Sequence, residues 1–224
     1  MNKFLKYLKK RWNNLLIKRE WWKSKRRQRK LLKGTDFTII SNNCWGSFTY
    51  QKYGLIYRTP TIGLSIMEED FVKMCQNLQY YMCNAKFIFI KPEESKYYEF
   101  LSSMGSNLEY PIGLLDDIEV HFIHYKTEQE AIEKWERRAM RINWNKILIK
   151  LSDRGQMTLE LLKNFSELPY EHKVFFAGDL NWIKEYPQTI YVPELQGIGK
   201  SNIDETPYDY ARCDTTILIN KLYQ

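Results

Sequence analysis

Short apolar runs alternate with amphipathic helical patterns along most of this chain, and that alternation restricts the fold more than any other feature. Apolar runs rich in β-branched and aromatic residues are typical of buried strands, whereas apolar residues repeated every three or four positions indicate helices. Strands that alternate with helices form a mainly parallel sheet with helices on both faces. The sequence therefore predicts a three-layer α/β/α fold. The expected strands are residues 37–40, 86–90, 118–125, 147–151, 174–176 and 189–192, and the expected helices are residues 67–83, 127–142, 159–165 and 208–222.

The start of the chain carries much of its positive charge. Of 34 Lys and Arg residues, 14 lie within residues 1–33, where Glu20 is the single acid. The rest of the chain then holds 20 bases and 26 acids, so a basic arm is joined to a mildly acidic body. Gly34 ends the arm, and no internal repeat or linker divides the body. We expect an arm of residues 1–34 and a single α/β domain of residues 35–224.

The arm has the pattern of a basic amphipathic helix, with Trp21, Trp22 and a polybasic block over residues 23–30. An apolar face, interfacial Trp and a run of bases suit a helix that lies on an anionic lipid surface. We therefore expect residues 1–33 to bind the inner face of a cell membrane. A structural arm and an arginine-rich RNA-binding segment are the alternatives. Nucleic acid is the less favoured of these partners, because the folded body is acidic. The apolar stripe comprises Phe4, Leu5, Leu8, Trp12, Leu15 and Leu16.

The sequence also indicates a compartment. The N-terminus lacks a continuous apolar region with a small-residue cleavage site, and no apolar run approaches the roughly 20 residues that cross a bilayer. The four cysteines (Cys44, Cys75, Cys83 and Cys213) form no CxxC pair and no metal-ligand spacing. We expect a cytoplasmic protein with reduced thiols, peripheral at the inner membrane face. Cys44 follows the first strand, but no neighbouring base in the sequence marks it as a nucleophile.

Two loops that follow expected strands carry candidate site residues. In parallel sheets, ligands bind at the carboxyl ends of strands, where such loops meet. Asn42 and Asn43 can hydrogen-bond a ligand there, although Asn also simply forms turns. Asp153 and Arg154 follow the strand of residues 147–151. The carboxylate suits a general base and the guanidinium suits phosphate, and a turn with a helix cap is the other interpretation.

His121 and His124 lie in the expected strand of residues 118–125. Their odd spacing places the two side chains on opposite faces of a strand. We therefore expect only one of them to be a general base that titrates near neutral pH, unless the strand ends or bulges between them. Asp116 and Asp117 precede this strand at its amino end, which argues against a metal pair. The sequence predicts no metal site.

Three arginines, Arg137, Arg138 and Arg141, lie on neighbouring faces of the helix expected over residues 127–142. Their guanidinium groups can clamp a diphosphate, which is the leaving group of a nucleotide-sugar donor. Glu133 lies one helical turn before Arg137 and offers it an ordinary partner. A solvated charged face is therefore the alternative to a diphosphate clamp.

Several long motifs of this chain together resemble one bacterial family. On these motifs the chain is similar to the family of domain of unknown function nineteen-nineteen, whose members are commonly labelled exopolysaccharide biosynthesis proteins. Ser47 stands where the family pattern has a glycine, and the last part of the chain matches loosely. The resemblance implies an α/β/α fold and a capsule or exopolysaccharide setting, but it implies no mechanism and no active site. The motifs are SNNCWG (41–46), YGLIYRTPTIGL (53–64), DFVKMCQNLQYY (70–81), YPIGLLDDIEVHFIHYKT (110–127), KWERRAMRIN (134–143), LSDRG (151–155) and LPYEHKVFF (168–176).

These observations lead to a transferase as the expected function. We expect a glycosyltransferase-like enzyme that acts on a nucleotide-sugar or a lipid-linked sugar at the cytoplasmic membrane face. Asp153 or His124 would deprotonate the acceptor hydroxyl, and the arginine cluster with Arg154 would stabilise the departing phosphate. A polysaccharide acyltransferase with His121 or His124 as its base is one alternative. A non-catalytic assembly or regulatory factor is the other. Donor, acceptor, cofactor and oligomeric state are left open by the sequence.

Overall fold

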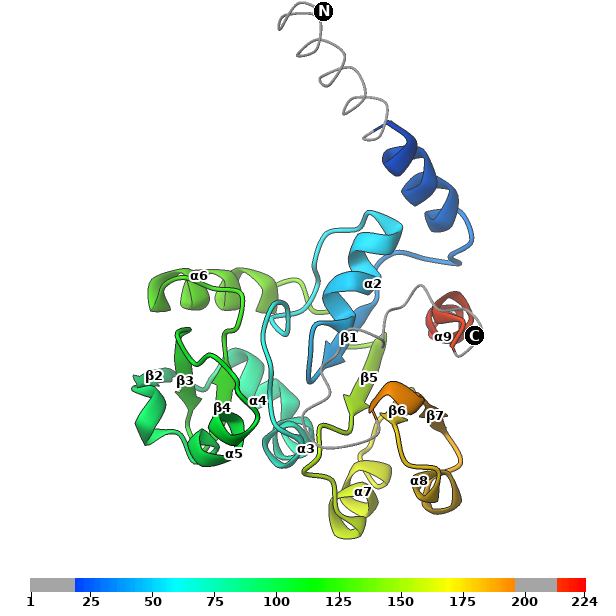
Figure 1. Cartoon of the computed structure of the whole chain (residues 1–224). Helices are drawn as coiled ribbons and strands as arrows, with labels where there is room; N and C mark the ends of the chain where they lie inside the picture. Colours follow the sequence, from blue (N-terminus) through cyan, green and yellow to red (C-terminus); the bar gives the residue numbers. More distant parts are fainter. Residues whose placement is uncertain (1–18, 196–212) are drawn as a thin grey trace, which may run out of the picture.

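Two separate sheets, one parallel and one antiparallel, organise the computed structural model, which describes residues 19–195 and 213–224 (Figure 1). The four-stranded parallel sheet has the order β1-β5-β6-β7, and the three-stranded antiparallel sheet has the order β2-β3-β4. The strands of the parallel sheet are β1 (Thr38–Ser41), β5 (Ile147–Ser152), β6 (Lys173–Ala177) and β7 (Thr189–Tyr191). The antiparallel strands are β2 (Phe87–Ile90), β3 (Ile112–Leu115) and β4 (Ile118–His121).

Helices connect most of these strands, and side-chain caps mark several helix starts. Thr127 accepts a hydrogen bond from the Glu130 N–H at the start of α6, and Thr158 and Asp214 cap α7 and α9 in the same way. The helices are α2 (Trp45–Tyr53), α3 (Glu68–Gln76), α4 (Leu78–Cys83), α5 (Tyr98–Ser103), α6 (Glu128–Ala139), α7 (Leu159–Ser166), α8 (Asn181–Glu185) and α9 (Thr215–Lys221), with 3-10 turns η1 (Pro92–Glu94) and η2 (Pro193–Leu195) and a helix over residues 19–29.

Strands β1, β5 and β6 are almost entirely buried, whereas the edge strand β7 is partly exposed. Strands that are buried on both faces are typically continuous apolar runs. Ile39, Leu148 and Phe176 pack in one core together with residues of α2 and α9. Ile149 and Phe175 pack in a second core together with residues of α3 and α7. The parallel sheet therefore packs against helices through two separate cores.

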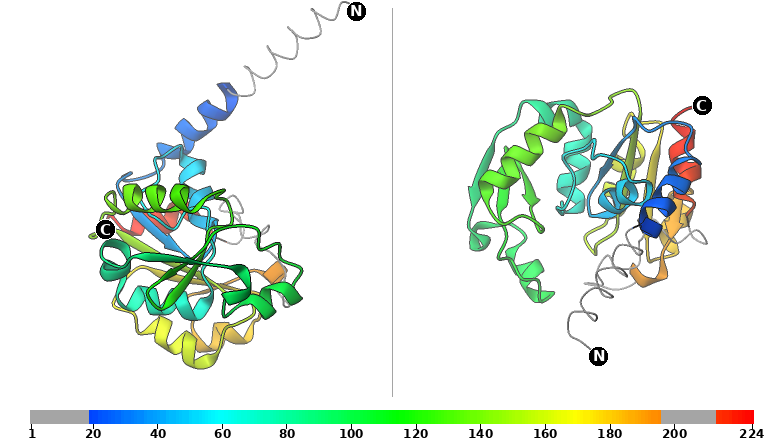
Figure 2. Two further views of the ribbon diagram at one scale, coloured as in Figure 1. Left: turned by 90° about the vertical axis from the view of Figure 1, so that its left-hand side faces the viewer. Right: turned by 90° about the horizontal axis from the view of Figure 1, so that it is seen from above.

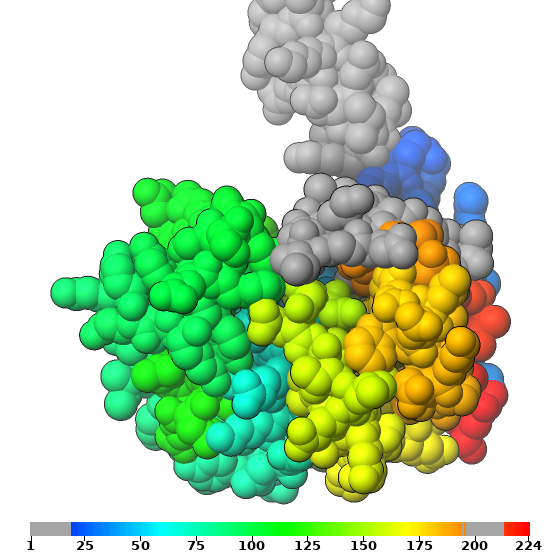
Figure 3. Space-filling view, turned by 60° about the horizontal axis from the view of Figure 1, so that its bottom comes forward, coloured from blue at the N-terminus to red at the C-terminus, as the bar shows by residue number. Residues whose placement is uncertain are grey.

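The antiparallel sheet shares the second core with the parallel sheet. Helix α3 contacts both β4 and β5, so it lies between the two sheets (Figure 2). Its Phe71 and Met74 are fully buried in the same cluster as Val120 of β4 and Ile149 of β5. In the space-filling view, the antiparallel part (green) and the residues that follow β5 (yellow) lie side by side (Figure 3).

The expectation of a mainly parallel sheet is wrong for two of the predicted strands. The strands expected over residues 86–90 and 118–125 leave the parallel sheet and pair antiparallel with β3, which the sequence pattern does not indicate. Asp116 adopts a left-handed backbone (φ 57°) in the tight turn that joins β3 to β4, and Asp is among the residues that tolerate it. Asp117 of the same turn accepts a hydrogen bond from the Tyr81 hydroxyl at 2.7 Å. Both aspartates of this pair therefore belong to a hairpin.

Other predicted elements differ at their ends. The helix expected over residues 67–83 is divided at Asn77, which leaves helical geometry with φ −136° and ψ 52°. The strand expected to reach Tyr125 ends at His121. The arm is helical over residues 19–29, while residues 1–18 and residues 208–212 of the expected final helix lie outside the described part of the chain. No helix among the described residues is both long enough and apolar enough to cross a bilayer.

Candidate functional site

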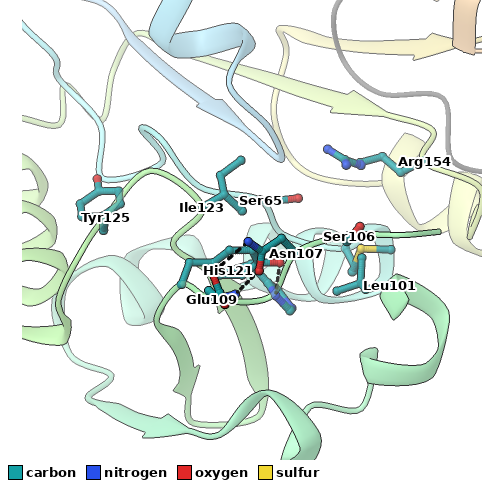
Figure 4. Close-up of a pocket in the computed structure, with 11 residues that line it drawn as sticks. Ser65, Leu101, Ser106, Asn107, Glu109, His121, Ile123, Tyr125 and Arg154 are labelled. Carbon is teal, nitrogen blue, oxygen red and sulfur yellow. Dashed lines mark hydrogen bonds between the residues drawn. The ribbon is translucent and has the colours of Figure 1, made fainter. Parts of the chain in front are cut away.

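A cavity of about 440 Å³ lies between the loop that follows β5 and the end of β4 (Figure 4). Residues 62–66 connect the end of β4, in the antiparallel sheet, to the end of β1, in the parallel sheet. The Ser65 N–H donates to the His121 carbonyl at 2.8 Å, and the Ile66 N–H donates to the carbonyl of Asn42, after β1, at 2.9 Å. The cavity therefore lies at the carboxyl-end edge of the parallel sheet, where ligands bind in such sheets. Its lining includes Ser65, Glu109, Tyr110, His121, Tyr125 and Arg154.

His121 is a buried titratable group of this cavity, with 2% of its surface exposed. It lies two residues after Glu119 on β4, and this spacing places both side chains on one face of the strand. The His121 Nε2 lies 3.4 Å from the Glu119 Oε2, within ion-pair distance when the ring is protonated, although Nε2 has no aligned hydrogen bond. The His121 Nδ1 lies 3.5 Å from the Tyr110 hydroxyl. The imidazole is thus held between a carboxylate and a phenol.

Glu119 is buried and fixed by several donors. The Ser95 hydroxyl donates to its Oε2 at 2.6 Å, and the Lys96 N–H donates to its Oε1 at 2.7 Å. Burial alone opposes ionisation of Glu119, but the interactions with His121, Ser95 and Lys96 outweigh it and lower the pKa of this carboxyl. Glu119 is therefore a carboxylate at neutral pH. A carboxylate beside one ring nitrogen orients the imidazole and leaves the other nitrogen to exchange a proton with a ligand.

Tyr110 and Arg154 complete the polar lining. Burial raises the pKa of Tyr110 to about 12, against the opposing effect of the Arg154 charge, so the phenol stays protonated at neutral pH. Arg154 comes from the loop after β5, and Figure 4 shows its guanidinium turned toward the space above His121. Its Nη1 is buried and has no hydrogen-bond partner. A buried guanidinium nitrogen without a partner is suited to an anionic ligand.

The backbone of the Arg154 loop is fixed by a carboxyl group from the first turn of α3. The Glu68 Oε1 accepts hydrogen bonds from the Arg154 N–H and, at 3.2 Å, from the Gln156 N–H. Glu68 is fully buried, its Oε2 has no partner, and burial raises the pKa of this carboxyl. Glu68 therefore fixes the backbone of the loop, while the Arg154 side chain remains available to the cavity.

Comparison with known proteins places the chain in a family. A family model described as "Domain of unknown function (DUF1919)" matches residues 15–214. The chain belongs to this family. It is also 32% identical over 175 residues to an uncharacterized protein of Haemophilus influenzae, and the match covers 78% of this chain and 75% of that protein. The family resemblance of the sequence motifs is thereby confirmed, whereas the exopolysaccharide setting stays a prediction.

In this DUF1919 chain, Asn42 and Asn43 bind other parts of the protein. Both polar atoms of the Asn42 side chain bond to the backbone of Ser152, with its Nδ2 donating to the carbonyl at 3.0 Å and its Oδ1 accepting from the N–H at 2.9 Å. The Asn43 Nδ2 donates to the Ser152 hydroxyl at 3.0 Å. The two side chains thus join the end of β1 to the end of β5. Neither contributes to the lining of the cavity.

Asp153 is turned away from its neighbour Arg154. Its Oδ2 accepts a hydrogen bond from the Trp182 Nε1 at 3.1 Å, and its Oδ1 accepts one from the Gly155 N–H at 2.8 Å. Burial raises the pKa of Asp153. The structure therefore brings Arg154 to His121 but directs Asp153 toward α8.

His124 and the arginines of α6 belong elsewhere. His124 and Arg138 line a second cavity. The two histidines therefore line different cavities, although β4 ends at His121 and strand geometry alone would not keep their side chains apart. Arg137 is exposed, and the Arg141 Nη1 donates to the Tyr57 carbonyl at 3.4 Å. Arg138 and Arg141 thus both contact Tyr57, while Arg137 is directed to solvent. Arg138 alone among them is buried.

Sequence reasoning missed Glu119, Tyr110 and Glu68. The spacing of Glu119 and His121, two positions apart in an expected strand, is a signal that would have identified the first of them. Tyr110 reaches the site from the loop before β3 and Glu68 from the start of α3, and neither position carries such a pattern. Over residues 19–195 and 213–224, no group of three or more His, Cys, Asp or Glu side chains is arranged to hold a metal ion.

Proposed function

We propose that this DUF1919 protein transfers a group from a phosphorylated donor to a hydroxyl acceptor, with His121 as the general base. In its specific form, the proposal is a glycosyltransferase-like step of bacterial capsule or exopolysaccharide assembly. The donor would be a nucleotide-sugar or a lipid-linked sugar. One observation carries the proposal: a buried histidine, held between the Glu119 carboxylate and the Tyr110 phenol, faces a cavity that also receives the unpartnered Arg154 nitrogen.

The proposed reaction follows from these positions. The acceptor hydroxyl gives its proton to the His121 Nδ1 as its oxygen attacks the electrophilic carbon of the donor. The bond from that carbon to the phosphate oxygen breaks, and its electron pair remains on the phosphate. Arg154 stabilises the negative charge that develops there, and Glu119 stabilises the imidazolium. General-base catalysis of this kind contributes roughly 100- to 10,000-fold to the rate.

The described part of the arm supports a membrane location in the same proposal. Trp21 and Trp22 are 50% and 61% exposed, whereas Lys25 is buried against the body and the Arg29 Nη1 donates to the Gly54 carbonyl at 3.4 Å. The base of the arm is therefore packed on the body, and its aromatic part is free to enter a lipid interface. Such placement would hold the protein at the membrane surface that carries lipid-linked acceptors. A W21S/W22S variant should bind anionic vesicles at least several-fold more weakly than the native chain, and equal binding would contradict the location.

The catalytic proposal is tested with H121Q and R154M, and with H124Q as the matched control in the second cavity. With a panel of nucleotide-sugars as donors, H121Q should lower kcat/KM at least about 100-fold, and R154M should raise the KM for the donor about tenfold or more. H124Q should retain activity within about twofold. Full activity of H121Q would overturn the assignment.

The same variants can be examined without knowledge of the donor. A strain that carries H121Q in place of the native gene should produce the same altered polysaccharide as a strain that lacks the gene, while H124Q should restore the native one. If the H121Q polysaccharide lacks one sugar, the result supports glycosyl transfer. If it lacks an acyl group, the proposed reaction would be acyl transfer and not glycosyl transfer. A native polysaccharide in the H121Q strain would favour a non-catalytic role.

A further inference from the structure

A second cavity, of about 350 Å³, lies between α2, the turn that follows β4, and α6. Tyr125 lines both this cavity and the one that contains His121. Cys44 and Phe48 border the second cavity from the side of α2, and Lys134 and Arg138 border it from α6. The space is thus adjacent to the proposed catalytic site but has its own set of charged residues.

Arg138 is the group of this cavity that most needs an explanation. Its side chain is 7% exposed, and each of its contacts in the described structure is neutral. The Nη1 donates to the Tyr125 hydroxyl and, at 3.5 Å, to the Ile62 carbonyl, and the guanidinium lies 5.1 Å from the centre of the Tyr57 ring. None of the ion pairs among the described residues includes Arg138. A buried cation without an anion is costly.

The neighbouring groups do not supply the missing negative charge. Burial raises the pKa of Cys44 and that of Tyr125, so both are neutral at neutral pH. The Glu130 carboxylate on α6 forms an ion pair with Lys134, and its Oε2 accepts a hydrogen bond from the Lys126 N–H at 3.0 Å. The second cavity therefore has an excess of positive charge.

We propose that the second cavity binds the phosphate group of a small phosphorylated ligand, with Arg138 as the principal contact. A guanidinium matches phosphate oxygens with two parallel N–H donors, and a bound phosphate supplies the counter-charge that Arg138 lacks. Lys134 is placed to add a further donor, and Phe48 and Tyr57 offer aromatic faces for an attached ring or sugar. The site uses neither His121 nor Arg154, so it is independent of the proposed catalytic function.

Calorimetric titration of the whole protein with inorganic pyrophosphate, at constant ionic strength, tests this site. The titrations use an R154M background, because a phosphate held by Arg154 in the first cavity then does not contribute. R154M alone should bind pyrophosphate. The double variant R154M/R138M should bind it at least tenfold more weakly, whereas R154M/R137Q, altered at the adjacent exposed arginine, should bind it as R154M does. Loss of all binding in R154M, or equal binding by R154M/R138M, would overturn the proposal.

A second pair of variants covers the case in which R138M disturbs folding. K134Q alters a partly exposed lysine at the edge of the cavity, and K163Q alters an exposed lysine on α7 as its control. In the R154M background, K134Q should weaken pyrophosphate binding about threefold or more, and K163Q should leave it unchanged. Equal affinities of the two variants would count against the site even if R138M does not fold.

Discussion

The loop after β1 and the loop after β5 both end strands of the parallel sheet, yet their polar side chains are used in opposite ways. Asn42 directs both of its polar atoms to the Ser152 backbone, and it is completely buried by the contact. Arg154 instead leaves a buried nitrogen unbonded at the edge of a cavity. Position at a strand end is therefore insufficient to mark a binding residue. The criterion that separates the two loops is whether the polar atoms already have partners within the protein.

The largest effect that this comparison predicts is on stability, at Asn42. N42A removes two buried hydrogen bonds to the Ser152 backbone, so it should lower the free energy of unfolding by about 3 kcal/mol. N145A, at an exposed loop position, should change it by less than about 0.5 kcal/mol. Urea unfolding followed by circular dichroism measures both. A loss at Asn42 no larger than at Asn145 would contradict the structural role of the first loop.

A smaller effect is expected at Glu68, which holds the second loop. Because burial raises the pKa of this carboxyl, the folded protein binds its proton more tightly than the unfolded chain does. The stability of the native chain relative to E68Q should therefore fall as the pH rises through and above the ordinary Glu value of 4.5. E68Q keeps an oxygen for the two backbone donors, so it should be the more stable protein at pH 7, and the difference should close near pH 4.

Unfolding free energies of the native chain and E68Q, measured across that pH range, provide the check. The exposed Glu160→Gln on α7 serves as the control and should show no such pH-dependent difference. A native chain that is more stable than E68Q at pH 7 would mean that Glu68 is held ionised, and that the second loop depends on its charge.

The parallel sheet could be predicted from the sequence because its strands are continuous apolar runs. The runs at residues 37–40, 147–151, 174–176 and 189–192 all lie within a few positions of the observed strands. Such runs arise where a strand is buried on both faces, and that condition holds for parallel sheets in general. The periodicity of α6 and α7 is equally clear, whereas α2, α5 and α8 were not predicted.

The antiparallel sheet could not be predicted in the same way. Residues 112–115 include Gly113, whose missing side chain allows the Phe87 ring of β2 to lie where a Cβ would be 2.6 Å from it. A four-residue strand that contains glycine has little strand signal of its own. Its position depends on the turn at Asp116 and on packing against β2, and both are contacts that only the folded chain reveals.

The candidate site was only partly predictable, because the sequence indicates residue type and position but not the direction of a side chain. Arg154 and His121 were identified by residue type and by position near a strand end, and the structure brings them to one cavity. Asp153 and His124 satisfied the same criteria and point elsewhere. Residue type indicates which side chains can do chemistry, whereas their direction is set by partners such as Trp182 that lie far away in the sequence.

The smallest expected effect, at Asp153, tests whether the catalytic base is identified by its position after a strand or by the direction of its side chain. In D153N the amide has one oxygen for two donors, the Gly155 N–H and the Trp182 ring, so about 1 kcal/mol of stability should be lost. In the assay in which H121Q loses activity, D153N should keep its activity within about twofold of the native value, because the Asp153 side chain is turned toward α8. A loss of 100-fold or more in D153N, with the fold intact, would identify Asp153 as the base and would remove the catalytic assignment from His121.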